Sequence, residues 1–505
     1  MKTIFELGAP GRRGFQLPEQ GLFTQDLAGL LGTENLRRSP LDLPECAEIE
    51  VVRHFSALAR LNYGVDDGFY PLGSCTMKYN PKINEVLAAL PGFTAAHPMA
   101  KPEDAQGSLA LLYQLEEALC RICGMEAFSL APAAGAHGEL TGLMVMAAYH
   151  QRNGQTQRNL ILIPDSAHGT NPASAALCGF QVKAVPSDER GLVSMPALRE
   201  AVAAAGETLA GLMLTCPNTL GLFEESVMEI SEEIHNAGGL VYYDGANLNA
   251  IMGATTPGIL GFDVVHVNLH KTFATPHGGG GPGAGPVGVK AHLAAFLPAP
   301  RVLKNGQACL SPTGDMLLPQ DSDVFTFDAS TPDSIGRVKA YYGNFGVLIK
   351  ALGYILTLGG DGLRAASRTA VLNANYIKQR LETAGDVPFG QTCLHEFVLS
   401  AGKLRDETGI SAMDIAKALI DRGYHPPTVY FPLIVREALM IEPTETETRE
   451  TLDGFIEAML DILTLAKSDP EAVKASPVKA PVSRPDDAQA ARSPILKVKP
   501  WAERV

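Results

Sequence analysis

The sequence is organised around one short stretch, Asn268-Leu269-His270-Lys271-Thr272-Phe273. This stretch follows an apolar, β-branched run at Val264–Val267, which predicts a buried strand. Burial disfavours the charged form of a lysine at the end of such a strand, so Lys271 is a candidate amine nucleophile for a carbonyl group. Taken by itself, Lys271 could instead extend its ammonium group to the protein surface.

A second predicted strand ends in a carboxylate shortly before this stretch. The apolar run Leu240–Tyr243 leads directly into Asp244 and Gly245. In open α/β sheets, ligands bind at the edge formed by the carboxyl ends of the strands. Pyridoxal phosphate chemistry uses such a pair, because a lysine holds the coenzyme as a Schiff base and an aspartate keeps its pyridine nitrogen protonated. Asp244 alone could be a helix cap, but the ordered pair predicts the coenzyme.

Composition indicates a loop-rich α/β enzyme and excludes several classes of partner. Apolar residues make up 46% of the 505 residues, with 50 glycines and 35 prolines. The net charge of −14 argues against binding to nucleic acid or to an anionic membrane surface. Because we find no signal-peptide core and no apolar run expected to span a bilayer, we expect a cytoplasmic protein. The scattered cysteines fit a reduced chain, with the one close pair, Cys120 and Cys123, on a buried helix face.

Strands alternate with helices over much of the chain, which predicts a mostly parallel sheet with right-handed crossovers. The N-terminal segment and the Pro-, Ala- and Lys-rich C-terminal segment bury little by themselves, so we expect both to pack on another subunit or domain. The expected regions are an N-terminal arm with an active-site loop (1–100), a coenzyme-binding large domain (101–345), a smaller C-terminal α/β domain (346–470) and an extended tail (471–505).

Two predicted strand-to-helix turns suit a phosphate or an aromatic ring. Gly135 and Ala136 precede a helix predicted to begin at Leu140, and small residues there let backbone N–H groups approach an anion. The turn lacks the Lys-Ser/Thr of a nucleotide P-loop, so a nucleotide is disfavoured, although a purely structural turn is an alternative. His168 follows the predicted strand Leu160–Pro164 and could place its ring on a bound aromatic ring, or could simply cap a helix.

A formal dinucleotide motif is excluded by its surroundings. Gly283, Gly285 and Gly288 match GxGxxG, but a strand is predicted at 285–290 where a dinucleotide site requires a helix. We expect this glycine run, from Gly278 onwards, to let the backbone pass close to a coenzyme or ligand.

Metal binding is not predicted either. His266 and His270 fall at even separations on one predicted strand face with Asn268, but no further ligands are evident. The pair His395-Glu396 does not form the HExxH motif of a zinc site.

Several segments together resemble the P-protein of the glycine cleavage system, the pyridoxal phosphate-dependent glycine decarboxylase. More narrowly, the chain is similar to the subunit that forms the C-terminal half where the enzyme is divided between two chains. The matching segments are Leu72–Lys78, Gly135–Glu139, Ser166–Pro172, Tyr243–Asn247, and Leu269–Phe273 with Pro276–Pro282. Ala134 and His137 stand where fused-chain relatives have Ser and Gln.

The resemblance implies a type I, aspartate aminotransferase-like fold and a set of coenzyme contacts. Lys271 would be the Schiff-base lysine, Asp244 the pyridinium partner and His168 the ring-stacking residue. The remaining expected coenzyme-binding residues are His270 and the backbone of Gly135 and Ala136, which would bind the phosphate, together with Asn247 and Thr215.

The resemblance also implies a reaction and partners. The chain would decarboxylate glycine and transfer the aminomethyl group to the lipoyl group of the H-protein, as a glycine dehydrogenase (aminomethyl-transferring). It would act with a homologous subunit, in a heterotetramer of two dimers. Another type I enzyme, such as an amino-acid decarboxylase or aminotransferase, would share Lys271 and Asp244 but would need no lipoyl acceptor. A non-catalytic scaffold subunit would have no need of this residue pair.

Overall fold

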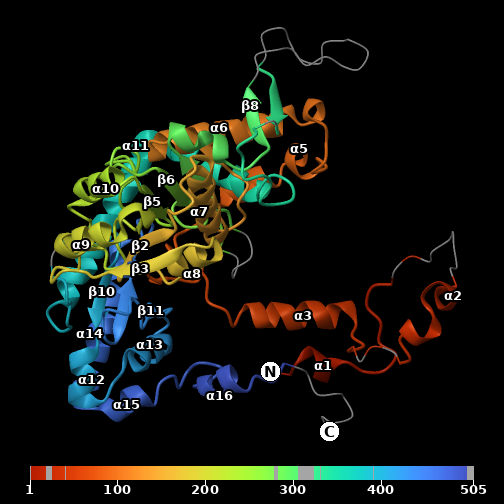
Figure 1. Cartoon of the computed structure of the whole chain (residues 1–505). Coiled ribbons are helices and arrows are strands. Elements are labelled where there is room, and N and C mark those ends of the chain that lie inside the picture. Colours follow the sequence, from red (N-terminus) through yellow and green to blue (C-terminus); the bar gives the residue numbers. More distant parts are fainter. Residues whose placement is uncertain are drawn as a thin grey trace. The chain divides into compact units, whose positions relative to one another are not determined.

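The computed structural model describes residues 2–16, 18, 26–39, 41, 43–277, 283–304, 323–329, 331–390 and 392–496. The chain forms two units, one of Gly68–Val478 and the other of Met1–Asp67 with Lys479–Val505 (Figure 1). Residues 278–282, the first part of the glycine run, lie outside the described residues, so the predicted approach of this backbone to a ligand stays a prediction.

The larger unit is built on a sheet that, within the described residues, has seven strands in the order β1-β7-β6-β5-β4-β2-β3. All run parallel except β7, which is antiparallel to its neighbours β1 and β6. This arrangement confirms the predicted α/β fold with a mostly parallel sheet. The strands are β1 (Ala127–Ser129), β2 (Leu160–Pro164), β3 (Gln181–Val185), β4 (Leu209–Leu214), β5 (Leu240–Gly245), β6 (Val264–Val267) and β7 (Val287–Val289).

Helices cover both faces of this sheet (Figure 1) because alternate strand residues point to opposite sides. On β5, Val241 and Tyr243 pack with residues of α6, α9 and α10, whereas Tyr242 packs with α7. Asp244, two residues after Tyr242, therefore projects toward the α7 face. The helices are α6 (Gln106–Cys123), α7 (Gly135–Arg152), α8 (Thr170–Leu177), α9 (Met195–Ala205) and α10 (Val227–Asn236).

Helix α7 lies unusually close to the sheet because it carries glycine where it crosses the strands. A Cβ atom at Gly138 would lie 2.3 Å from the carbonyl oxygen of Gly285, and one at Gly142 would lie 2.5 Å from the Tyr242 ring. The helix begins at Gly135, five residues before the predicted start at Leu140. Gly135 and Ala136 therefore belong to its first turn, and β7 confirms the strand predicted after the glycine run.

The C-terminal part of the larger unit has a core of its own around a small antiparallel sheet. Its strand order is β10-β12-β11, and helices α12 to α15 pack with it. The predicted extended tail is thus helical at its start. The elements are β10 (Phe397–Ser400), β11 (Thr428–Val429), β12 (Ala438–Ile441), α12 (Gly402–Thr408), α13 (Ala412–Asp421), α14 (Arg449–Ser468) and α15 (Pro470–Lys474).

Helix α11 (Phe345–Leu381) connects the two cores and breaks at Gly359, where φ is 60° and ψ is −174°. The break falls in the glycine-rich stretch Gly359-Gly360-Asp361-Gly362. By length and composition, α11 could span a membrane, because the mean hydropathy of its most apolar window is 1.3. The sequence had led us to expect no such apolar run. Much of that window, 44%, is buried inside the protein, and α11 packs on α4, α6 and α14. These contacts are typical of a core helix.

The remaining elements are short, apart from α3. In the smaller unit, α3 spans Glu48–Ala59. Cys123 of α6 is buried and Cys120 half-buried, both as free thiols. The other elements are α1 (Ile4–Leu7), α2 (Leu27–Leu31), α4 (Lys82–Ala88), α5 (Pro91–Thr94), α16 (Asp487–Arg492), β8 (Arg301–Lys304), β9 (Phe325–Asp328), and the 3₁₀ turns η1 (Thr33–Asn35), η2 (Pro102–Asp104), η3 (Gly206–Thr208) and η5 (Ala291–Phe296).

Candidate active site

A pocket at the carboxyl ends of the parallel strands brings together all of the predicted site residues except His270. Lys271 follows β6 and is half-buried, and its Nζ donates a hydrogen bond to the carbonyl oxygen of Ser74, 2.7 Å away. The described lining residues come from segments far apart in the chain: Ser74, Gly135, Ala136, Glu139, His168, Thr170, Thr215, Pro217, Asn218, Thr219, Asp244, Ala246, Asn247, His266, Asn268, Lys271, His395 and Glu396.

Asp244 is 4% exposed at the end of β5, and donors surround its carboxylate. Asn171 Nδ2 donates to Oδ2 at 2.9 Å, and the Ala246 N–H donates to Oδ1 at 3.1 Å. The Nε2 atom of His266 lies 3.3 Å from Oδ1. Burial acts to raise the pKa of Asp244, but His266, Asn171 and the Ala246 N–H together lower the pKa below its ordinary value. The carboxylate is therefore held in its charged form.

The proton position on His266 follows from its second neighbour. The Tyr242 hydroxyl lies 2.8 Å from His266 Nδ1 and can donate to it, which leaves the imidazole proton on Nε2, facing Asp244. Burial lowers the pKa of His266 below its ordinary value, so the ring is neutral near pH 7. Strand register explains the contact, since Asp244 and His266 are paired on neighbouring parallel strands.

Glu139, on the second turn of α7, is a further buried acid in the pocket. Its side chain is 2% exposed and accepts a hydrogen bond from Thr170 Oγ1 at 2.9 Å, while Oε1 has no partner within the described residues. Burial, aided by the nearby charge of Asp244, raises the pKa of Glu139 to about 7. No sequence pattern pointed to Glu139, although it lies within the Gly135–Glu139 segment.

The start of α7 provides a cradle of backbone N–H groups. The first intrahelical hydrogen bond runs from the Gly138 N–H to the Ala134 carbonyl, so the amides of Gly135 and Ala136 precede the helical ladder. A Cβ atom at Gly135 would lie 2.4 Å from Asn268 Oδ1, a buried atom with no partner among the described residues. Helix N-termini with free amides bind anions such as phosphate. The residues present thus fit a phosphate group.

Three other predicted residues line the same pocket. The exposed His168 ring lies 5.4 Å from the Phe431 ring, and its Nδ1 lies 3.0 Å from Thr170 Oγ1. Thr215 Oγ1 is buried with no partner in the described structure. Asn247 donates to Glu442 Oε1 at 2.9 Å and to Thr76 Oγ1, so its amide also helps to hold neighbouring segments together.

His270 stands apart from the pocket. Its Nδ1 accepts a hydrogen bond from the Ala284 N–H at 3.4 Å, and its ring contacts His277. The prediction that His266 and His270 share a strand face is wrong, because β6 ends at Val267 and the chain turns through His270. Burial, with the nearby His277 and Lys271, lowers the pKa of His270 to about 3. Its predicted phosphate contact stays a prediction.

The loop that carries Ser74 is held by buried acids from the C-terminal core. Glu396 Oε2 accepts a hydrogen bond from the Ser74 N–H at 2.7 Å. Glu442 accepts from the Thr76 N–H at 3.0 Å and from Thr76 Oγ1 at 2.6 Å. These contacts join residues more than three hundred positions apart, and the sequence analysis did not predict them.

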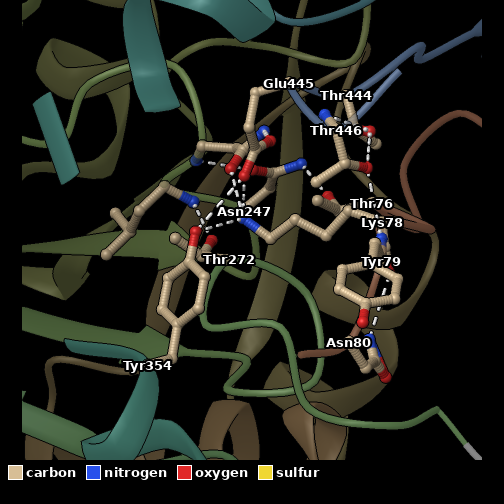
Figure 2. A network of polar contacts seen from close by, with 12 residues as sticks. Thr76, Lys78, Tyr79, Asn80, Asn247, Thr272, Tyr354, Thr444, Glu445 and Thr446 are labelled. Carbon is tan, nitrogen blue, oxygen red and sulfur yellow. Dashed lines mark hydrogen bonds and ion pairs between the residues drawn. The ribbon is translucent and has the colours of Figure 1, made fainter. Parts of the chain in front are cut away.

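Lys78 anchors the end of the same loop in a buried polar network (Figure 2). Its Nζ donates to Glu445 Oε1 at 2.7 Å, to Asn249 Oδ1 at 2.9 Å and to the Tyr354 hydroxyl at 3.2 Å. The Lys78 side chain is 1% exposed. Burial acts against its charged form, but Glu445 and Tyr354 outweigh burial and raise the pKa of Lys78. The ion pair therefore fixes the loop that holds Lys271.

Comparison with known proteins gives a consistent result. The family model described as glycine cleavage system P-protein matches residues 31–305, and a glycine dehydrogenase C-terminal domain model matches residues 366–480. The chain is similar to proteins named probable glycine dehydrogenase (decarboxylating) subunit 2. The relative from Caldanaerobacter subterraneus is 55% identical over 494 residues and the one from Listeria monocytogenes 54% over 497, with 98% of both chains covered in each case.

Solved structures support the same fold. An inhibitor-bound glycine decarboxylase (P-protein) has a TM-score of 0.70 at 22% identity, covering 86% of this chain and 94% of the other. A cysteine desulfurase from Thermococcus onnurineus has a TM-score of 0.57 at 13% identity, covering 79% and 95%. At these identities the likeness concerns the fold, and it confirms the predicted type I architecture.

The Lys78→Met variant should lose about 3–5 kcal/mol of unfolding free energy, because it leaves the Glu445 carboxylate buried without its ion-pair partner. Urea unfolding measures this loss. The matched control is Arg436→Met, which breaks the ion pair between Arg436 and Asp406. The side chains of Arg436 and Asp406 are 61% and 59% exposed, so this variant should change the free energy of unfolding little. Equal losses in the two variants would contradict the anchoring role of Lys78.

Glu139 should make the stability of the coenzyme-free protein depend on pH. Because folding raises its pKa from 4.5 to about 7, its stabilising contribution is fully present below pH 4.5 and is lost as the pH rises to about 7. Between these limits the wild type should lose up to about 3 kcal/mol more than Glu139→Gln. Thermal unfolding across this pH range measures the difference in stability. The control is Glu117→Gln, because the Glu117 side chain is 46% exposed, and its stability should depend on pH as that of the wild type does.

Proposed function

Because this chain belongs to the P-protein family of the glycine cleavage system, we propose that it decarboxylates glycine and transfers the aminomethyl group to the lipoyl group of the H-protein. One observation carries the proposal: a strand-end lysine and a charged, buried strand-end aspartate line one pocket, beside a helix N-terminus that fits a phosphate. This combination suits pyridoxal phosphate. The chain then acts as a soluble, cytoplasmic glycine dehydrogenase (aminomethyl-transferring).

Lys271 would hold the coenzyme covalently through its side-chain amine. Its amine lies at the carboxyl edge of the sheet and is oriented by the Ser74 carbonyl, the acceptor of its hydrogen bond. When bound, the coenzyme supplies an electron-accepting ring that takes up the electron pair left when CO2 departs. Lys271 would also be the amine that substrate glycine replaces on the coenzyme.

Asp244 holds a proton on the pyridine nitrogen. Its charge is preserved in the core by Asn171, by the Ala246 N–H and by His266. A neutral side chain in this place would bind no pyridinium proton, so the ring would accept electrons poorly. The ring of His168 covers one face of the coenzyme ring in this proposal.

The remaining predicted residues bind the phosphate and the ring edge. Gly135 and Ala136 line the pocket at the start of α7, where the helix dipole favours negative charge near their amides. Thr215 Oγ1 and Asn268 Oδ1 are buried and have no partner in the described part of the chain, so they suit polar contacts to the coenzyme. His270 completes the phosphate contacts.

The proposal includes a homologous subunit as partner, in a heterotetramer of two dimers. Relatives named "subunit 2" support it. Helix α3 of the smaller unit also presents an apolar stripe, with Ile49, Val52 and Phe55 each more than half exposed. Such a stripe is costly in water and suits a protein interface.

Borohydride reduction followed by peptide mapping should place the pyridoxyl group on Lys271 and nowhere else. Lys271→Arg should abolish the label, because a guanidinium does not form a Schiff base. Lys290→Ala is the matched control, since Lys290 is also half-buried and its Nζ also donates to a backbone carbonyl, that of Gly124. Labelling at another lysine in the wild type would contradict the assignment.

Asp244→Asn should bind the coenzyme but lower the decarboxylation rate by about 100-fold or more, equivalent to about 2.7 kcal/mol of transition-state stabilisation. The glycine–bicarbonate exchange rate of coenzyme-loaded protein measures the effect. Asp263→Asn is the control, because Asp263 is also buried beside a histidine, His235, but precedes β6 at the opposite end of the strand. Near-normal exchange in Asp244→Asn would refute the proton-holding role.

Co-expression with the homologous subunit should give a stable complex that exchanges CO2 far faster than the isolated chain. Size-exclusion chromatography and exchange assays test this, with an expected interface of about 2,000 Å² or more. Replacing Val52 and Phe55 by Ser should weaken the complex, whereas Ser in place of Arg53, on the same helix, should not. Full activity of the chain alone, with no complex, would contradict the two-subunit proposal.

A further inference from the structure

The pocket has an unusual charge balance for a site that takes an amino acid. Among the described residues that line it, Lys271 is the only lysine and none is an arginine. In the proposed function, the Lys271 amine is committed to the coenzyme when glycine first binds, so it does not recognise the incoming carboxylate. The pocket therefore needs other hydrogen-bond donors for that carboxylate.

A buried pair of acids supplies one such donor. Glu396 is 3% exposed and Glu442 is fully buried, and oxygen atoms of the two lie within 4.8 Å of each other and of a nitrogen of His395. Two carboxylates this close in a buried site do not both ionise. Burial and the neighbouring Glu442 raise the pKa of Glu396 well above its ordinary value.

Hydrogen bonds indicate which acid of the pair carries the proton. Glu442 accepts three hydrogen bonds, from the Thr76 N–H, Thr76 Oγ1 and Asn247 Nδ2, and these satisfy a charged carboxylate. Glu396 accepts one, from the Ser74 N–H at its Oε2. Glu396 is thus the neutral acid, and unlike Glu442 it lines the pocket.

His395 supplies a second neutral donor. The ring is 2% exposed and lines the pocket, with Nε2 3.7 Å from Glu396 Oε1. Its Nδ1 is buried and has no hydrogen-bond partner within the described residues. Burial lowers the pKa of His395, so the ring is neutral near pH 7. A buried polar nitrogen without a partner in a ligand pocket indicates a ligand contact.

We propose that His395 Nδ1–H and the uncharged carboxyl group of Glu396 form the subsite for the carboxylate of glycine. This inference rests on the proposed function and names the groups that recognise its substrate. Neutral donors orient the carboxylate without neutralising it. The carboxylate loses its negative charge as CO2 departs. An arginine would bind that charge most strongly before the reaction, and would thereby stabilise the ground state more than the transition state.

The test compares two amines that bind the coenzyme-loaded complex, glycine and methylamine, which lacks the carboxylate. Dissociation constants are taken from the change in the visible spectrum on titration with each amine. His395→Gln removes the donor at the Nδ1 position and should weaken glycine binding by about 10- to 100-fold, the range for a hydrogen bond to a charged group. Methylamine binding should change less than about twofold.

Matched variants separate this role from a structural one. His395→Asn places an amide N–H near the Nδ1 position and should keep glycine binding within about fivefold of wild type. Glu396→Gln keeps a neutral donor and should behave in the same way. All three variants, His395→Gln, His395→Asn and Glu396→Gln, introduce an amide side chain. A general loss of packing would therefore weaken glycine binding in all three alike.

The outcomes are distinct. If wild-type complex shows no spectral change with glycine, the proposed function fails before the subsite is tested. If the wild type responds but His395→Gln binds glycine normally, another group holds the carboxylate and the inference is overturned. Equal weakening of glycine and methylamine also overturns it, because the defect then does not concern the carboxylate. A large loss of glycine binding in Glu396→Gln would show that a charged acid is needed there and would contradict the neutral subsite.

Discussion

A carboxylate that stays charged inside the protein core is the constraint on which the site depends. Asp244 is 4% exposed, and a buried charge without partners costs several kcal/mol. Its donors come from three places: Asn171 on α8, the turn after β5, and His266 on β6. The parallel register of β5 and β6 pairs Asp244 with His266, and Tyr242 sets the proton on that ring. The glycines of α7 let the helix approach this strand face closely, which brings its free N-terminal amides to the same pocket.

The other half of the site depends on acids rather than on apolar packing. Lys271 donates to a carbonyl of the Ser74 loop, and that loop is held by Glu396, Glu442 and, through Lys78, Glu445. These glutamates flank strands of the C-terminal core, so the small sheet positions a loop from the start of the larger unit. The same arrangement places Glu396 and His395 in the lining of the pocket.

Local sequence patterns predicted the part of the site that strand ends provide. Lys271 and Asp244 follow apolar runs, and parallel strands necessarily bring their carboxyl ends to one edge, so the pair could be inferred without a structure.

Glu396 and Glu442 gave no such signal, because their role comes from contact with a loop more than three hundred residues earlier. His266 was noted only as a possible metal ligand, since its pairing with Asp244 depends on strand register. His270 was placed on the wrong face because nothing in the pattern marks the end of β6 at Val267. The sequence did not predict the early start of α7, since Gly135, Ala136 and Gly138 are typical of a turn as well as of a close-packed helix.

The protonation state of the coenzyme ring tests the central claim most directly. Coenzyme labelled with ¹⁵N at the pyridine nitrogen can be bound to the complex and observed by NMR. A buried, charged Asp244 predicts the chemical shift of a protonated pyridinium in the wild type near neutral pH, and that of an unprotonated ring in Asp244→Asn. An unprotonated nitrogen in the wild type, or the same protonated signal in both proteins, would contradict the account.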